Sequence, residues 1–309
     1  MANLSAEHVA VVADDLSRLA RTQSRTYLQQ SWGRFRRNHV AVGALVIVAI
    51  ALVFGYGAPL ISHLVTHRSY ADQNLLLRFK QPGQDGYLLG SDNLGRDLLT
   101  RLAYGTRVSM TVGLLAVVSA LVLGCTLGAI AGYYGRWADS LIMRFVDMML
   151  AFPTLFLLIF ISTLVTIGPN GLAIVIAVVS WMGLARLVRG EILSLRERDF
   201  VQAARVIGAP DWRIIVFHIL PNVVPIVIVW ATLAVPGFIL AEASLSFLGF
   251  GVQPPTPSLG NMLTDAITFI DQTMLLLLIP GITLYVIVLA INVFGNGLRD
   301  ALDPRLGEN

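Results

Sequence analysis

The sequence predicts an all-α, polytopic membrane protein that crosses the bilayer six times. Of its 309 residues, 56% are hydrophobic and only 13% are charged, whereas an average soluble domain has about 25% charged residues. The apolar residues gather in six runs along the chain. A helix of about 20 mainly apolar residues spans the hydrocarbon layer, so we interpret the runs as six transmembrane helices.

The predicted spans divide the chain into five parts. The spans cover about residues 40–60, 108–132, 148–167, 172–187, 223–248 and 274–294. The parts are an N-terminal segment (1–38), the first transmembrane helix (39–64), an external loop (65–107), a core of five spans (108–296) and a C-terminal tail (297–309). Membrane lipid is therefore an expected partner. The net charge of +3 gives no reason to expect nucleic acid.

Basic residues beside the spans predict the orientation, because cytoplasmic segments near span ends are rich in Lys and Arg. The N-terminal segment carries Arg18, Arg21, Arg25, Arg34, Arg36 and Arg37. The region between the fourth and fifth spans carries Arg186, Arg189, Arg196, Arg198, Arg205 and Arg213. We therefore expect both termini and this region in the cytoplasm. The loop 65–107 opposes this assignment, since it is rich in basic residues, but its length weakens the rule.

A compact polar element, residues 199–221, lies between the fourth and fifth spans. Positions at i, i+3, i+4 and i+7 share one helix face, and here they are Phe200, Ala203, Ala204 and Ile207. Asp199 can cap this helix, and Gly208 can adopt the left-handed conformation that ends it. Pro210 suits the start of a second short helix that stops before Pro221. The predicted partner-contacting residues are Asp199, Phe200, Gln202, Ala203, Ala204, Arg205, Ile207, Gly208 and Pro210.

Glycines at 124, 128 and 132 repeat every four residues within the second predicted span. Small residues at this spacing line one helix face and allow another helix to approach closely. The neighbour is either another helix of this chain or a second subunit, with internal packing as the favoured reading.

Glu242 lies near the outer end of the fifth predicted span, where a buried charge is costly unless paired or hydrated. Two readings are open. Glu242, with Ser244 and Ser246, lines a translocation path, or it is an interfacial carboxylate capped by the turn of Ser244 to Ser246. Other carboxylates in the apolar spans are few, which weighs against a proton relay.

The sequence lacks the motifs of an enzyme or a metal site. Its single lysine, Lys80, is followed by Gln81, so the phosphate-binding loop G-x-x-x-x-G-K-[ST] cannot form. No G-x-S-x-G motif is present, the five histidines show no ligand spacing, and the single cysteine, Cys125, excludes an internal disulfide. We therefore expect no catalytic residues, no metal and no cofactor bound by this chain.

The polar element resembles a known signature. Gln202-Ala203-Ala204, Gly208 and the run His218 to Pro221 match the E-A-A-x3-G-x9-I-x-L-P signature of ABC importer permeases. Gln202 stands in place of Glu and His218 in place of Ile, as in the dipeptide and oligopeptide branch. Three further stretches resemble the second permease subunit of that branch: LGSDNLGRD at 89–97, AEASLSFLG at 241–249 and GNGLRDALDP at 295–304. Asn296 replaces an expected Asp, and the likeness spans about residues 32–306.

This resemblance implies the transmembrane domain of a type I ABC importer in a bacterial or archaeal cytoplasmic membrane. The implied partners are a second homologous permease, two cytoplasmic ATPase subunits and an extracytoplasmic solute-binding protein. ATP and Mg would be bound by the ATPase subunits, and the element 199–221 would couple them to the permease. Di- or oligopeptides are the implied substrates, with nickel or another small solute as the alternative.

Two rival functions remain open from the sequence. A gradient-driven secondary transporter would use ionisable residues within the membrane and no ATPase partner. A membrane scaffold or receptor subunit would recruit a partner through the polar element without moving a solute. Uptake that depends on ATP, uptake that depends on an ion gradient, or no uptake would distinguish the three.

Overall fold

A computed structural model describes residues 27–164 and 168–303, and these ranges contain helices and connecting segments without a β-sheet. The helices are α2 (Tyr27–Arg37), α3 (His39–Tyr56), α4 (Ala58–Leu60), α5 (Leu98–Tyr134), α6 (Arg136–Leu150), α7 (Thr154–Leu164), α8 (Pro169–Leu195), α9 (Asp199–Val206), α10 (Asp211–Arg213), α11 (Leu220–Phe247), α12 (Leu259–Thr268) and α13 (Leu275–Leu302). Short π-helices follow α4 (Ile61–Thr66) and α10 (Ile214–Ile219), and 3₁₀ turns occupy Leu75–Leu77 and Gln84–Gly86. The predicted all-α class is confirmed.

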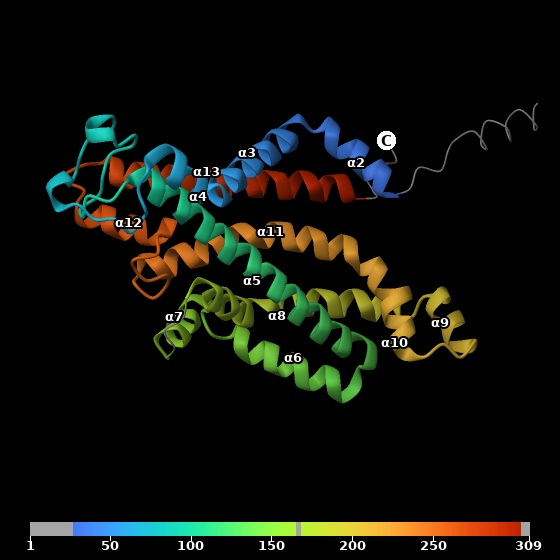
Figure 1. Ribbon diagram of the computed structural model, residues 1–309. Coiled ribbons are helices and arrows are strands. Elements are labelled where there is room, and N and C mark those ends of the chain that lie inside the picture. Colours follow the sequence, from blue (N-terminus) through green and yellow to red (C-terminus); the bar gives the residue numbers. More distant parts are fainter. Residues whose placement is uncertain (1–26, 165–167, 304–309) are drawn as a thin grey trace, which may run out of the picture.

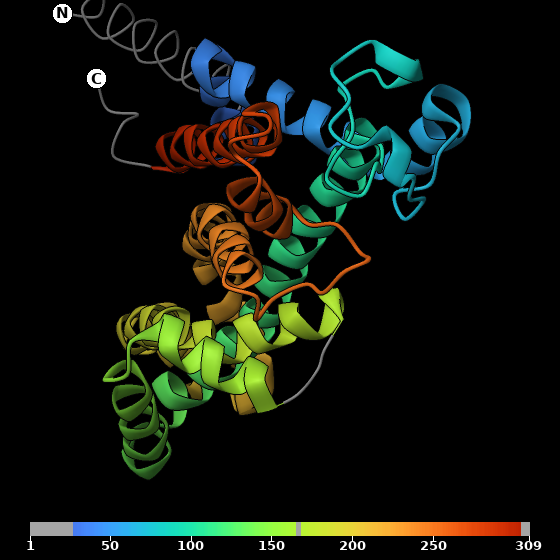
Figure 2. The same ribbon diagram turned by 90° about the vertical axis from the view of Figure 1, so that its left-hand side faces the viewer.

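The long helices run side by side and give the molecule two ends (Figures 1 and 2). At one end, named here the α9 end, lie α9, α10 and α2. At the other, the α12 end, lie α12 and the segment 67–97. The helices α3 and α13 pack together, and a hydrogen bond of 2.7 Å from Arg34 Nη1 to the carbonyl of Asp303 joins α2 to the end of α13. Both ends of the described chain therefore lie at the α9 end.

Two of the membrane-spanning helices, α5 and α13, are clearly longer than their apolar runs alone indicated. Within residues 27–164 and 168–303, five helices are long and apolar enough to cross a bilayer, and there are six such spans if the bent pair α6 and α7 is counted as one. The helix α5 starts at Leu98, inside the predicted loop 65–107, and α13 continues to Leu302, inside the predicted tail. Polar residues extend these helices because they continue the backbone hydrogen bonding beyond the apolar run.

The third predicted span is not a straight helix. Helix α6 ends at Leu150 and α7 begins at Thr154, and the two are bent by 91°. Pro153 lies in the break, where its ring and missing N–H prevent an uninterrupted helix. The span predicted over 148–167 is therefore broken at Pro153 into α6 and α7, and its residues 165–167 lie outside the described part of the chain.

The glycines of α5 allow α8 to approach closely. A Cβ atom added at Gly124 would lie 2.8 Å from Leu184 Cδ2, and one at Gly128 would lie 2.6 Å from the carbonyl oxygen of Ala185. At Gly132 the nearest atom would be the carbonyl oxygen of Arg189, at 2.9 Å. The neighbour is thus a helix of the same chain, which confirms internal packing as the role of this repeat.

Replacing Gly128 with leucine is expected to destabilise the bundle strongly. The new side chain would overlap backbone atoms of α8, which cannot rotate away, and overpacking typically costs about 1–3 kcal/mol or more. The yield of folded protein and its thermal unfolding temperature in detergent should both fall. Gly183, which has no atom within 4 Å of an added Cβ, is the matched control. Equal stability of Gly128→Leu and Gly183→Leu would contradict this packing.

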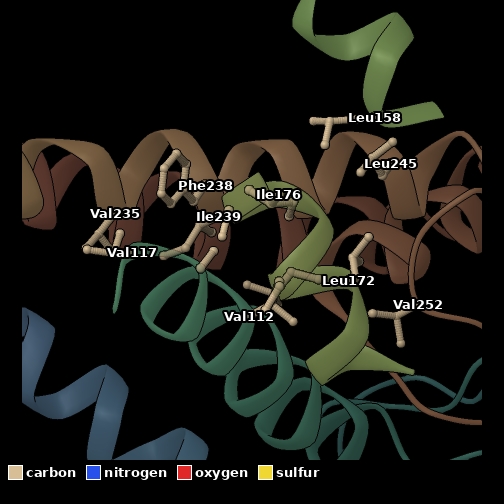
Figure 3. Packing of buried hydrophobic residues seen from close by; sticks show 14 of the residues in the cluster. Val112, Val117, Leu158, Leu172, Ile176, Val235, Phe238, Ile239, Leu245 and Val252 are labelled. Atoms are coloured by element: carbon tan, nitrogen blue, oxygen red, sulfur yellow. The ribbon is translucent and has the colours of Figure 1, made fainter. Parts of the chain in front are cut away.

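Apolar side chains from several helices, α5, α8 and α11 among them, form the centre of the bundle (Figure 3). Val112 and Val117 of α5 face Ile239 of α11, with Ile176 of α8 beside them. These four side chains are almost completely buried. The core thus ties α5, α8 and α11 together between the two ends of the molecule.

A buried ion-pair network holds the segment 67–97 at the α12 end. Arg96 Nε lies 2.6 Å from Asp92 Oδ2, and Arg96 and Arg101 reach Asp265 of α12 at 3.2 and 3.3 Å. Burial raises the pKa of Asp265 above its usual value, while Arg101 and Arg96 act in the opposite direction. Arg96 and Arg101 are among the basic residues of the loop 65–107 that opposed its external assignment. In the structure their role is to fix this segment on α12.

Candidate functional site

The first candidate site is α9 with the turn that follows it. Helix α8 ends at Leu195, and Arg198 occupies the position before α9 without a capping side-chain hydrogen bond. The predicted capping role of Asp199 is wrong, because Asp199 is the first residue inside the helix. Gln202 Nε2 instead donates to the carbonyl of Arg196 at 3.2 Å. This side-chain contact ties α9 to the end of α8.

One face of α9 packs against its own chain. Val201 is fully buried, and Ala204 is 5% exposed. Both belong to an apolar cluster with Val188 and Ile192 of α8 and with Ile214 of the π-helix after α10. Ala204 was predicted on the partner-contacting face, but the structure places it on this inner face. The spacing of Ala204 from Phe200 allows it to lie at the edge of either face of α9. Only the contacts with α8 and the π-helix show that it belongs to the inner face.

The opposite face of α9 is open. Phe200 is 42% exposed and Ile207 is 83% exposed, and Ala203 is exposed beside them. Val206, which the sequence reasoning missed, is 87% exposed. These four residues, Phe200, Ala203, Val206 and Ile207, are named here the outer face of α9. Exposed apolar side chains on a short helix at the end of a bundle are typical of a docking surface.

The turn after α9 has the backbone conformation expected from the sequence. Gly208 has a φ of +81°, a left-handed conformation that favours glycine. Its N–H donates to the carbonyl of Arg205 at 2.9 Å, and the N–H of Ala209 donates to that of Ala204 at 3.0 Å. Pro210 then precedes α10.

The predicted second short helix does not stop before Pro221. Helix α10, the π-helix Ile214–Ile219 and α11 form one helical run from Asp211 to Phe247. Pro221 is accommodated because it lies in the first turn of the α11 segment, where the π-helical hydrogen-bond pattern changes. The turn at Gly208 is therefore the break between α9 and the helical run that contains α11. A movement of α9 can be passed to α11 without a second break in that run.

Polar contacts fix the α9 end to α5 and were not predicted from the sequence. The hydroxyl of Tyr133 donates to Asp211 Oδ1 at 2.6 Å, and the Arg205 guanidinium lies 5.4 Å from the centre of the Tyr133 ring. Arg196 Nη1 donates to the carbonyl of Gly132 at 3.2 Å. These contacts join residues more than 60 positions apart, so no local sequence pattern reveals them.

The second candidate site surrounds Glu242, which is completely buried. Its Oε2 accepts a hydrogen bond of 2.5 Å from Ser109 of α5, and its Oε1 accepts one of 2.7 Å from Ser246. Ser109 Oγ also accepts from the N–H of Leu259 at 3.2 Å, and Ser246 Oγ from that of Val252 at 3.0 Å. Glu242 and Ser246 therefore join α5, α11 and α12 and face no open path in this conformation. Of the interfacial alternative, the hydrogen bond from Ser246 is present, but the carboxylate is completely buried.

Ser244 lies apart from this polar cluster. It is partly exposed and lines a cleft of about 340 Å³ with apolar side chains of α7, α11, α12 and α13. Of the three residues predicted for a path, Ser244 alone reaches a cleft. Among the described residues no group of three His, Cys, Asp or Glu side chains is placed to hold a metal ion.

Comparisons with known proteins identify the family. Residues 124–308 match the family described as "Binding-protein-dependent transport system inner membrane component", and residues 26–82 match the "N-terminal TM domain of oligopeptide transport permease C". The chain belongs to this permease family. The family predicted from the resemblance is therefore confirmed, and the chain is a multi-pass permease of a binding-protein-dependent transport system.

Two curated relatives cover nearly the whole permease. The dipeptide transport system permease protein DppC of Alkalihalophilus pseudofirmus is 42% identical over 278 residues, which are 90% of each chain. The oligopeptide transport system permease protein OppC of Haemophilus influenzae is 40% identical over 304 residues, which are 97% of this chain and 96% of the relative.

A solved structure supports the fold. An inward-facing structure of the MetNI methionine ABC transporter has a chain that superposes with a TM-score of 0.53 at 19% identity, over 65% of this permease and 96% of that chain. The similarity shows the transmembrane fold of an ABC importer. At this level of identity it shows the fold alone.

Proposed function

We propose that this permease pairs with a second, homologous permease to form the translocation path of an ATP-driven importer of di- or oligopeptides. The observation that carries the proposal is the outer face of α9, an exposed apolar surface on a helix that the chain itself anchors from the other side. The family supports the same role, since its members belong to binding-protein-dependent transport systems.

The partner at α9 is, in this proposal, a cytoplasmic ATPase subunit that binds ATP and Mg. The arginines of α2 and those near the end of α8 lie at the α9 end, which supports a cytoplasmic position for that end and for both termini. A groove on the ATPase would receive Phe200, Ala203 and Ile207 as an amphipathic helix is received. An extracytoplasmic solute-binding protein would deliver the substrate at the α12 end.

ATP-driven movement of the ATPase would reach the path through α11. The inner face of α9 packs on the start of the run from Asp211 to Phe247, so α9 and α11 move as a packed unit. Hydrogen bonds from Tyr133 and Arg196 connect the same region to α5. A rigid-body shift of α9 would therefore tilt several spans together and exchange outward for inward access.

Peptides are the proposed substrates because relatives at about 40% identity are named for dipeptide and oligopeptide transport. The test is reconstitution in vesicles with candidate partner permeases, ATPases and binding proteins, followed by uptake of labelled di- and tetrapeptides and of nickel. ATP-dependent peptide uptake is the expected result. Uptake of nickel alone would reassign the substrate, and uptake that follows an ion gradient without the ATPases would overturn the importer.

A further inference from the structure

Helix α2 carries an exposed surface that the coupling mechanism does not use. On its inner side Phe35 is buried, with its ring centre 5.8 Å from that of Phe294 in α13. Trp32 is 57% exposed and stacks on Phe35, with 5.8 Å between the ring centres, and Arg36 and Arg37 are also exposed. Trp32, Arg36 and Arg37 are named here the α2 surface.

The α2 surface has positive charge without a partner in the described part of the chain. Helix α2 contains three arginines in its last turn and no acidic residue. Arg34 is engaged by the carbonyl of Asp303, whereas Arg36 and Arg37 make no ion pair or hydrogen bond with the described residues. Two adjacent exposed guanidinium groups are suited to bind phosphate oxygens.

The position of α2 places this charge where the chain enters the membrane. Helix α3 begins at His39, and only Asn38 separates it from α2; the Asn38 side chain accepts a hydrogen bond of 3.1 Å from the N–H of Ala41. The 18 residues of α3 have a mean hydropathy of 2.3, so they cross the hydrocarbon layer. The last turn of α2 therefore lies at the level of the lipid headgroups, where indole rings are also favoured.

We propose that the α2 surface binds the headgroups of anionic phospholipids. The guanidinium groups of Arg36 and Arg37 would contact phosphate oxygens, and the ring of Trp32 would lie along the first methylene groups of the acyl chains. An amphipathic helix with this distribution lies in the plane of the interface, and anionic lipid attracts basic side chains there. This site is separate from the α9 surface and from the transport proposal.

Lipid-specific quenching of Trp32 tests the proposal. The full-length chain is reconstituted in phosphatidylcholine vesicles that contain an equal mole fraction of brominated phosphatidylglycerol or brominated phosphatidylcholine. The difference in emission between the natural chain and Trp32→Phe isolates the signal of Trp32 from the other tryptophans. Quenching by the brominated anionic lipid should be about threefold stronger, because the two arginines enrich the anionic lipid around Trp32.

Charge variants separate headgroup binding from simple insertion. The double variant Arg36→Gln/Arg37→Gln, measured with and without Trp32→Phe, should remain quenched but lose the preference for the anionic lipid. Arg78→Gln removes an exposed arginine from the segment 67–97 at the α12 end. This control variant should keep the preference of Trp32 for the anionic lipid. Equal quenching of Trp32 in the natural chain by both lipids would overturn the proposal. Absence of quenching by either lipid would also overturn it, because Trp32 would then lie away from the bilayer.

Discussion

Replacing Phe200 with aspartate is expected to abolish ATP-driven uptake while the permease stays folded. Phe200 belongs to the outer face of α9 and is 42% exposed, so the folded chain tolerates a charge there. In a docking groove the same carboxylate would be buried without a partner, which costs several kcal/mol. Loss of a central aromatic anchor weakens binding by about 2 kcal/mol or more, roughly thirtyfold.

Binding of the ATPase subunits to the purified permease and substrate-stimulated ATP hydrolysis both measure this effect. Phe200→Leu keeps an apolar side chain and is expected to retain most of the binding and uptake. Thermal unfolding of Phe200→Asp should match that of the natural chain. Normal ATPase binding and uptake by Phe200→Asp would show that the outer face of α9 is not the coupling surface.

Of the substitutions proposed for this permease, Glu242→Ala is expected to lower the free energy of unfolding most. Both carboxylate oxygens accept hydrogen bonds, from Ser109 and Ser246, and the side chain is completely buried. The substitution leaves two hydroxyl groups without their acceptor and opens a cavity in the polar cluster. Unsatisfied buried groups cost about 1–3 kcal/mol each, so the free energy of unfolding should fall by about 2–5 kcal/mol.

Thermal unfolding in detergent and the yield of membrane-inserted protein measure this loss. Glu242→Gln keeps one acceptor oxygen and the volume of the side chain, so a smaller loss and nearly normal uptake are expected. Ser244→Ala, on the same helix but outside the polar cluster, is the control for position. If Glu242→Gln retained normal stability but lost uptake, a role of Glu242 in the translocation path would replace the packing role described here.

The sequence predicted the membrane spans well and their ends poorly. The length of an apolar run reports the hydrocarbon thickness, whereas α5 and α13 continue through polar residues, to Leu98 and Leu302, because their backbones remain hydrogen bonded. The position of the break beside Pro153 follows from the proline itself, whereas its angle of 91° does not. A proline breaks the local ladder of hydrogen bonds, but whether the chain then continues straight or turns depends on packing against other helices.

At the candidate site, local geometry could be predicted and tertiary contacts could not. The left-handed backbone at Gly208 follows from the residue itself. The division of α9 into an inner face with Ala204 and an outer face with Val206 depends on what packs beneath the helix. The bond between Ser109 and Glu242 joins residues 133 positions apart. Such contacts leave no periodic signal in a single sequence.

Accessibility of a cysteine at position 207 tests the central claim most directly. In a Cys125→Ala background, Ile207→Cys is treated with a membrane-impermeant maleimide in sealed vesicles of known orientation, with and without bound ATPase subunits. Leu76 is 91% exposed on the segment at the α12 end. The variant Leu76→Cys therefore reports labelling from the external side of the membrane. We expect labelling of position 207 only from the cytoplasmic side and protection by the ATPase. Labelling from the external side, or labelling that bound ATPase leaves unchanged, would contradict the coupling role of α9.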